Sequence, residues 1–220
     1  TGTLLLCLPI SSKAREFTSL LDCLFTATSA TCVTGLVVRD TWSQFSLFGQ
    51  VVILMLIQVG GLGLVTLTSF FALAARRRMG FRDLRLLGES VSADGLSKAT
   101  EVLKIVIKLA AAFEAVGIVL LLFAFVPQFG ARGIWVSVFN SVSAFCNAGF
   151  DLMGINEEYS SFTKYAADPL VNITIMLLII IGGIGFTIWN EVRTKKFKLS
   201  RYSLHAKIVI STTLILVFGG

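Results

Sequence analysis

The chain has 220 residues, of which 55% are hydrophobic and only 15% are charged, and its mean hydropathy is +0.83. This balance excludes an ordinary soluble globular domain and indicates an integral membrane protein. The net charge of +6 does not indicate a nucleic-acid-binding protein, because the basic residues gather beside apolar segments rather than among exposed aromatic residues.

Three apolar segments are long enough to cross a bilayer, which takes roughly 20 helical residues: 45–75, 102–126 and 169–190. The N-terminal residues 1–9 resemble the end of another helix, and residues 208–220 begin one more. We therefore expect a multi-pass protein of the cell membrane, with the chain cut inside a helix at both ends.

Charge divides the connections between these segments into two kinds. Residues 76–85 and 193–207 are strongly basic, and the positive-inside rule predicts that they are cytoplasmic. Residues 39–44 and 151–169 carry little or net negative charge, so we expect them outside. The basic loops most simply determine topology and contact lipid phosphates.

Two stretches of the chain repeat each other. "FTATSATCVTG" at 25–35 aligns with "FNSVSAFCNAG" at 139–149, and the Phe, Ser, Ala, Cys and Gly of each stretch are identical. Further along, "QVGGLG" at 58–63 aligns with "IIGGIG" at 180–185. Two similar units in one chain indicate a repeat architecture.

The repeated segments cannot be ordinary spans. If both basic loops are cytoplasmic, the chain between them must cross the membrane twice, and the segments 102–126 and 169–190 supply these two crossings. The apolar part between these spans is too short to cross and must enter from outside and return there. The same reasoning applies to 17–36. Non-helical backbone at membrane depth is tolerated only where it is buried in protein or lines a water-filled path.

The expected fold is therefore an all-α integral membrane protein built from units of outer helix, pore helix, filter and inner helix. The unit boundaries that we expect are a first unit at 1–78, with a truncated outer helix, a pore loop at 17–40 and an inner helix at 45–75; a cytoplasmic basic linker at 79–101; a second unit at 102–198, with an outer helix at 102–127, a pore loop at 133–151 and an inner helix at 169–192; and the start of a third outer helix at 199–220.

The composition of the repeated stretch fits an ion filter. Backbone carbonyls can replace the hydration shell of a cation, and a pore helix that ends there directs its negative dipole end at the pathway. Gly35 and Gly149 can adopt backbone angles that bulky residues cannot. Nearby hydroxyls can tie the loop to its neighbours where no water is available, namely those of Thr28, Ser29, Thr31, Thr34, Ser141 and Ser143.

The motifs "ATSATCVTGL", "NSVSAFCNAGFDL", "IQVGGLG" and "IIIGGIGF" resemble those of the Trk/Ktr/HKT potassium transporter superfamily, and within it the Ktr-type membrane subunits. The resemblance covers essentially the whole chain. It implies four units around one pore with pseudo-fourfold symmetry, of which this chain holds about two. It also implies a potassium pathway, often sodium-linked, built as a membrane homodimer and gated by a cytoplasmic nucleotide-binding ring subunit, which parts of 76–98 and 193–207 would touch.

Carried over residue by residue, the resemblance implies two potassium filters. The matching residues are Thr31, Cys32, Val33, Thr34 and Gly35 in the first filter, and Phe145, Cys146, Asn147, Ala148 and Gly149 in the second. Glycine at the last position of each filter favours potassium over sodium in this family. Potassium is then the transported ion, and we expect no covalently bound cofactor. The third and fourth filters and the gating elements of the later inner helices do not lie in this chain.

Other residues have two interpretations each. Small inner-helix residues allow close packing beneath the filter and bending: Gly60, Gly61, Gly63, Gly182, Gly183 and Gly185. Asp151 and Asp40 either raise the cation concentration at the outer mouth or cap the loops. Glu114 lies within a span, where we favour a structural hydrogen bond or a protonated carboxyl group.

No enzyme constellation competes with transport. The chain has no nucleophile, histidine and acid set and no phosphate-binding loop, and its four cysteines lack zinc or redox spacing. Two alternatives stay open: a membrane scaffold or receptor fragment whose repeats only pack, and a two-unit protein that dimerises to give four filters. A scaffold should tolerate bulky residues at Gly35 and Gly149, whereas a pore should not.

Overall fold

The chain folds into helices throughout the part that the computed structural model describes, residues 1–77, 91–195 and 201–219. Within these ranges there is no β-strand, and an isolated antiparallel bridge joins Ser12 to Phe45. The predicted helical class is confirmed for these residues. The α-helices are α1 (Gly2–Cys7), α2 (Leu20–Thr31), α3 (Thr41–Gln44), α4 (Leu47–Arg77), α5 (Val91–Phe129), α6 (Ala131–Phe145), α7 (Pro169–Gly183), α8 (Phe186–Lys195) and α9 (Leu204–Gly219), with short 3-10 helices at Pro9–Ser11, Met153–Ile155 and Thr163–Tyr165.

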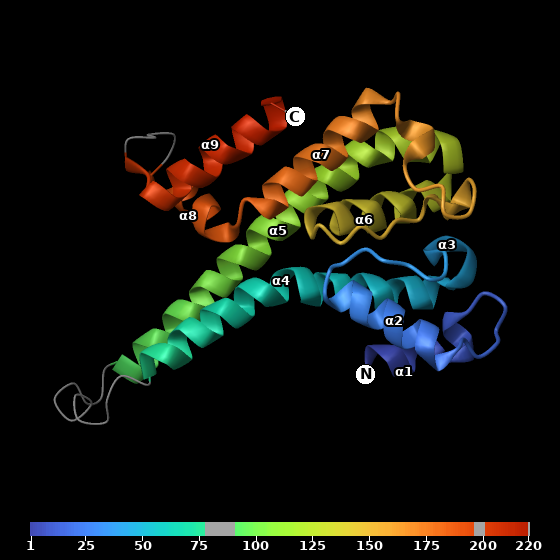
Figure 1. Cartoon of the computed structure of the whole chain (residues 1–220), viewed down its shortest axis with the longest axis horizontal. Coiled ribbons are helices and arrows are strands. Elements are labelled where there is room, and N and C mark those ends of the chain that lie inside the picture. Colours follow the sequence, from blue (N-terminus) through green and yellow to red (C-terminus); the bar gives the residue numbers. More distant parts are fainter. Residues whose placement is uncertain (78–90, 196–200, 220) are drawn as a thin grey trace.

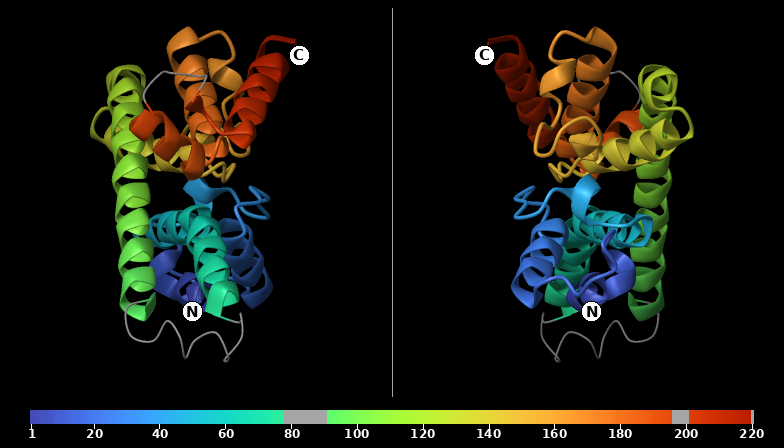
Figure 2. Two further views of the ribbon diagram at one scale, coloured as in Figure 1. Left: turned by 90° about the vertical axis from the view of Figure 1, so that its left-hand side faces the viewer. Right: turned by 90° about the vertical axis from the view of Figure 1, so that its right-hand side faces the viewer.

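The main helices pack in two groups (Figure 1). Helices α1 and α2 pack on the first part of α4, while α6 and α7 pack on α5 and on each other. The two groups meet where α4 contacts α5 and α6. Figure 2 shows the first group below the second, with α5 running past both. Each group therefore contains one short helix, α2 or α6, that ends at one of the predicted filter loops.

Helix α4 is the long helix of the first group, and its start is fixed by Ser46. The Ser46 carbonyl accepts the amide N–H of Gln50 at 2.9 Å, and its hydroxyl accepts that of Gly49 at 3.3 Å. The first is the opening i→i−4 bond of the helix, and the second satisfies a first-turn amide that has no partner within the helix. The helix runs for 31 residues, from Leu47 to Arg77, close to the predicted inner helix over 45–75.

Helix α5 is the long helix of the second group and begins earlier than expected. It starts at Val91, so residues 91–101 of the predicted linker are helical, while 79–90 lie outside the described residues. Pro127 stands near its end, and Gly130, with φ at +58°, turns the chain into α6. A single residue between the two helices makes α6 fold back against α5.

The predicted inner helix over 169–192 is divided in two. Helix α7 is capped at its start by the Asp168 carboxylate, which accepts the Leu170 and Val171 amides at 2.9 and 3.2 Å. It ends at Gly183, and α8 begins at Phe186. The reason is Gly185, whose φ of +91° is incompatible with a continuous right-handed helix. The Trp189 indole N–H donates to the Ile181 carbonyl across the break at 2.9 Å.

Helix α9 follows α8 after a short connection. The Glu191 carboxylate accepts the Ser203 amide at 2.9 Å, and the Ser203 hydroxyl accepts the Ala206 amide at 3.2 Å. These bonds anchor the start of α9 beside α8. Of the expected third-unit segment 199–220, residues 199, 200 and 220 lie outside the described residues.

The core lies where the two groups meet. Phe45 and Ile53 of the first group pack with Phe125 and Phe139 of the second, and all four are fully buried. Many large apolar side chains face outward instead; Phe123 on α5, for example, is 69% exposed. Among the described residues, Lys104–Phe129 is the helical stretch long and apolar enough to cross a membrane, and 47–63, 169–183 and 204–219 are shorter apolar helices.

Gln50 and Trp135 join the two groups through a partly buried hydrogen bond. The Trp135 indole N–H donates to Gln50 Oε1 at 2.7 Å, and Gln50 Nε2 donates to the Phe45 carbonyl at 2.9 Å. We predict that Trp135→Phe lowers the free energy of unfolding by about 1–3 kcal/mol, because it leaves a buried amide oxygen without its donor. Thermal unfolding of the purified protein in detergent measures the loss. A Trp135→Phe variant as stable as the wild type would contradict the prediction.

Candidate functional site

Helix α2 ends in a turn that fixes the first predicted filter, the first loop (residues 31–36). The Val33 amide donates to the Ala30 carbonyl at 3.3 Å, and the Thr34 amide reaches back to the Ser29 carbonyl at 3.0 Å. These two bonds form the Schellman motif, which satisfies carbonyls that a helix C-terminus otherwise leaves open.

Helix α6 ends in the same turn, which fixes the second loop (residues 145–150). The Asn147 amide donates to the Ala144 carbonyl at 3.1 Å, and the Ala148 amide donates to the Ser143 carbonyl at 2.8 Å. Each donor and acceptor lies 114 residues after its counterpart in the first loop, so the sequence repeat is also a repeat of backbone hydrogen bonds.

The backbone angles of the two loops match as well. Val33 and Asn147 have φ of +57° and +58°, and Gly35 and Gly149 have φ of +74° and +72°. Asparagine and glycine tolerate this left-handed region, but a β-branched residue such as Val33 is strained there. The first loop therefore stores backbone strain that the second loop avoids.

A serine hydroxyl closes each loop. Ser29 Oγ donates to the Leu36 carbonyl at 2.7 Å, and Ser143 Oγ donates to the Phe150 carbonyl at 2.5 Å. Ser141 Oγ also donates to the Glu114 carbonyl at 2.8 Å. The prediction that hydroxyls tie these loops to their neighbours is confirmed for Ser141, whereas Ser29 and Ser143 each bond to the loop that follows their own helix.

The two loops meet at their glycines. A Cβ atom added to Gly35 would lie 2.7 Å from the Ala148 carbonyl oxygen and 3.0 Å from Gly149 Cα. One added to Gly149 would lie 3.0 Å from Gly35 Cα. Side chains at either position would therefore collide with the backbone of the other loop, in addition to straining their own.

Two inner-helix glycines make room for the ends of α2 and α6. A Cβ atom on Gly60 would collide with the Thr31 carbonyl, and one on Gly182 would collide with the Phe145 carbonyl. These pairs are again related by the repeat. The other predicted inner-helix glycines are less alike. A Cβ atom added to Gly61 would lie 2.6 Å from Cys146 Sγ, and one added to Gly183 would lie 3.8 Å from Asn147 Nδ2. A Cβ atom added to Gly63 or Gly185 would have no described atom within 4 Å.

The ten predicted filter residues lie in these two loops, but not all of them in extended backbone. Thr31 and Phe145 are the last residues of α2 and α6, and Thr31 Oγ1 donates to the Ala27 carbonyl at 2.8 Å. In the first loop Cys32 is exposed, whereas in the second Ala148 is fully buried. The second loop is held further: Asn147 Nδ2 donates to the Ile179 carbonyl of α7 at 3.3 Å.

Both predicted mouth carboxylates accept hydrogen bonds from their own surroundings. Asp40 Oδ1 caps α3 by accepting the Ser43 amide at 2.7 Å, and Oδ2 accepts the Tyr159 amide at 3.2 Å. Asp151 accepts the Met153 amide at 2.8 Å. Burial, with a smaller contribution from the charge of Asp40, raises the pKa of Asp151.

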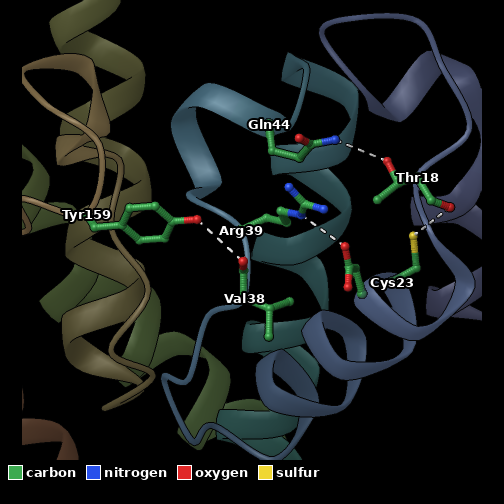
Figure 3. A network of polar contacts seen from close by, with 7 residues as sticks. Thr18, Cys23, Val38, Arg39, Gln44 and Tyr159 are labelled. Atoms are coloured by element: carbon green, nitrogen blue, oxygen red, sulfur yellow. Dashed lines mark hydrogen bonds and ion pairs between the residues drawn. The ribbon is translucent and has the colours of Figure 1, made fainter.

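The segment after the first loop is held on two sides (Figure 3). The Tyr159 hydroxyl, from the connection after the second loop, donates to the Val38 carbonyl at 3.4 Å. Arg39 Nε donates to the Asp22 carboxylate of α2 at 2.9 Å in an exposed ion pair. The outer connections of the two units are thus linked beside the loops.

One polar cluster was not predicted as a unit. Gln58 of α4 lies between Glu114 of α5, whose carboxylate it contacts at 3.0 Å, and Cys146 of the second loop. The predicted structural hydrogen bond of Glu114 is confirmed. The sequence signal for Gln58 is its amide within an uncharged apolar segment, but its partners are remote in sequence. In the part of the chain with described side chains, no group of three or more His, Cys, Asp or Glu residues could hold a metal ion.

Two helices that end at paired glycine loops, in a fold with many exposed apolar side chains, are compatible with a membrane transport protein. The chain belongs to the TrkH cation transport protein family, whose model matches residues 2–217.

Similar proteins carry potassium in their names. The chain is 36% identical to the potassium/sodium uptake protein NtpJ of Enterococcus hirae over 220 residues, covering 100% of this chain and 48% of that protein. It is 39% identical to the Ktr system potassium uptake protein B of Bacillus subtilis over 217 residues, 98% of this chain and 47% of that protein. Identity to protein B of Vibrio alginolyticus is 36% over 221 residues, 99% of this chain and 47% of that protein. The chain spans about half the length of these relatives.

The strain at Val33 gives a testable difference between the loops. We predict that Val33→Asn raises the free energy of unfolding by about 1 kcal/mol, because asparagine tolerates the left-handed conformation. Asn147→Val should lower it by about 1–3 kcal/mol, because it adds strain and removes the bond to Ile179. Thermal unfolding of the two purified variants measures both changes. Shifts of the same sign would contradict the argument.

Gly60 and Gly63 form a matched pair on one helix. Gly60→Ala should lower the free energy of unfolding by about 1–3 kcal/mol, because its Cβ atom collides with the Thr31 carbonyl. Gly63→Ala should be neutral or stabilising by up to about 1 kcal/mol, because alanine favours a helix and the added atom meets nothing. Equal melting temperatures for the two variants would rule out close packing beneath the first loop.

Proposed function

We propose that this chain forms the first half of a potassium uptake pathway in the cell membrane, in which the first and second loops are two of the selectivity filters. The observation that carries the proposal is the meeting of two loops with the same hydrogen bonds, backbone angles and terminal glycines. The names of the relatives, which include potassium uptake, support potassium as the substrate.

The hydrogen bonds indicate which carbonyls would contact the ion. Those of Leu36 and Phe150 are occupied by serine hydroxyls, so each loop is closed at its outer end. The carbonyls of the filter residues before them are the candidates for ion coordination. The C-terminal ends of α2 and α6 add partial negative charge near both loops, which favours a cation.

The proposed mechanism is desolvation rather than covalent chemistry. A potassium ion loses its water shell and gains carbonyl ligands whose spacing the Schellman turns and serine bonds maintain. The name of one relative includes sodium, so sodium coupling or sodium permeation belongs to the same proposal. That the similar proteins are uptake proteins also supports the interpretation that the chain is not an enzyme.

We also propose the membrane topology and assembly that such a pathway requires. In this proposal the chain crosses the membrane several times, the units are those expected from the sequence, and two further filters complete the pore. The membrane subunit forms a homodimer and works with a cytoplasmic nucleotide-binding ring subunit. Loop chimeras at 193–207 that still respond normally to the ring would exclude a contact there.

The alternative function is a membrane scaffold whose repeats only pack. It predicts that the loops tolerate larger residues wherever the protein still folds. The proposed pore predicts a change in ion preference even in variants that fold, because selectivity depends on the loop backbone itself.

The experiment is potassium-limited growth of an uptake-deficient bacterium that expresses the full-length protein containing this chain. We predict that the wild type rescues growth and that Gly35→Ser and Gly149→Ser, at matched membrane levels, abolish rescue or shift uptake from potassium toward sodium. Both substitutions strain a backbone with positive φ, at about 1–3 kcal/mol, and crowd the facing loop.

The control is Gly63→Ser, where an added Cβ atom meets no described atom within 4 Å. It should rescue growth as well as the wild type. The ratio of sodium to potassium uptake separates a changed filter from a merely unstable protein, because a lower amount of protein reduces both fluxes together. Full rescue by both loop variants with an unchanged ratio would exclude the filter assignment and favour the scaffold function.

A further inference from the structure

We infer that Gln58 and Glu114 are positioning residues for the second loop and that they set its ion selectivity through Cys146. This inference rests on the proposed function and names residues outside the two predicted filters. The three side chains come from three different segments: α4 of the first group, α5 of the second, and the second loop.

The contacts form a chain that ends at the filter. Gln58 Nε2 donates to Glu114 Oε1 at 3.0 Å, which turns the amide oxygen toward Cys146. The Cys146 thiol donates to Gln58 Oε1 at 3.8 Å. Cys146 is the residue that caps α6, directly before the left-handed Asn147. A shift of its side chain would therefore move the start of the second loop.

Packing against α4 also restricts Cys146. Gly61, one turn beyond Gln58, leaves no room for a Cβ atom against Cys146, which would lie 2.6 Å from Sγ and 2.8 Å from Cβ. Glu114 is only 8% exposed, and its carbonyl accepts the Ser141 hydroxyl of α6 at 2.8 Å. Glu114 of α5 thus bonds to α6 through its backbone carbonyl, and its side chain reaches the second loop through Gln58.

The sequence repeat supports a role beyond packing. In the alignment of the inner helices, Gln58 corresponds to Ile180, so an apolar residue suffices at the second copy of the position. A carboxyl group and an amide inside a membrane segment are costly to bury, and such residues commonly mark functional positions. Gln58, Glu114 and Cys146 therefore connect the first unit to the second where Gly61 of α4 also packs against Cys146.

The test measures the ratio of potassium to sodium uptake in cells that express the full-length protein at matched membrane levels. Gln58→Leu and Glu114→Leu should each lower the ratio by about fivefold or more, because each removes the hydrogen bond that orients the Gln58 amide toward Cys146. The double variant should lower it no further than either single variant, because both act through one chain of contacts. Glu114→Gln keeps an acceptor oxygen for Gln58 and should retain most of the wild-type ratio.

The matched control is Thr174→Val, which removes a buried hydroxyl that bonds only to the Leu170 carbonyl of its own helix among the contacts described. It should leave the ratio unchanged. If Gly35→Ser and Gly149→Ser change the ratio while Gln58→Leu and Glu114→Leu match Thr174→Val, the positioning role is excluded and the filters stand. If the glycine variants have no effect, the proposed function fails and the positioning role fails with it. A loss in Glu114→Gln equal to that in Glu114→Leu would also overturn the inference.

Discussion

The structure depends on one constraint: peptide groups that leave a helix inside hydrocarbon must find partners within the protein. The ends of α2 and α6 meet this constraint in the same way. A Schellman turn satisfies the last helical carbonyls, and a serine hydroxyl satisfies the carbonyl that closes each loop. These bonds supply the internal partners that the proposed pore requires for an irregular backbone at membrane depth. The short helices, the paired glycines and the close inner-helix packing all serve this arrangement.

The two copies of the loop share their hydrogen bonds but differ in their surroundings. Asn147 bonds to α7 and follows a buried helix end, whereas Val33 keeps the same backbone angle without the tolerance that asparagine has. Cys146 lies against α4, while Cys32, its counterpart, is exposed. A repeat of the backbone is therefore compatible with different side-chain environments, which is what allows each loop to be tuned separately.

Much of this could be predicted from sequence, because local patterns determine it. The apolar runs indicated helices, and the small-residue repeat indicated where two of them end at special backbone angles, as Gly35 and Gly149 show. The break at Gly185 was missed because a glycine within an apolar run is compatible with a continuous helix. The partners of Gln58 and the bond between Asp40 and Tyr159 could not be predicted, because these residues lie 56 or more positions apart in the chain and meet only through the packing of the two groups.

The break between α7 and α8 makes the inner helices of the two groups differ in continuity. Helix α4 runs without interruption from Leu47 through Arg77. Helix α7 ends at a glycine joint beside which an added Cβ atom meets nothing, with Trp189 bridging it by a single bond to Ile181. The described part of the chain therefore contains an unbroken inner helix in the first group and one interrupted by a left-handed glycine in the second.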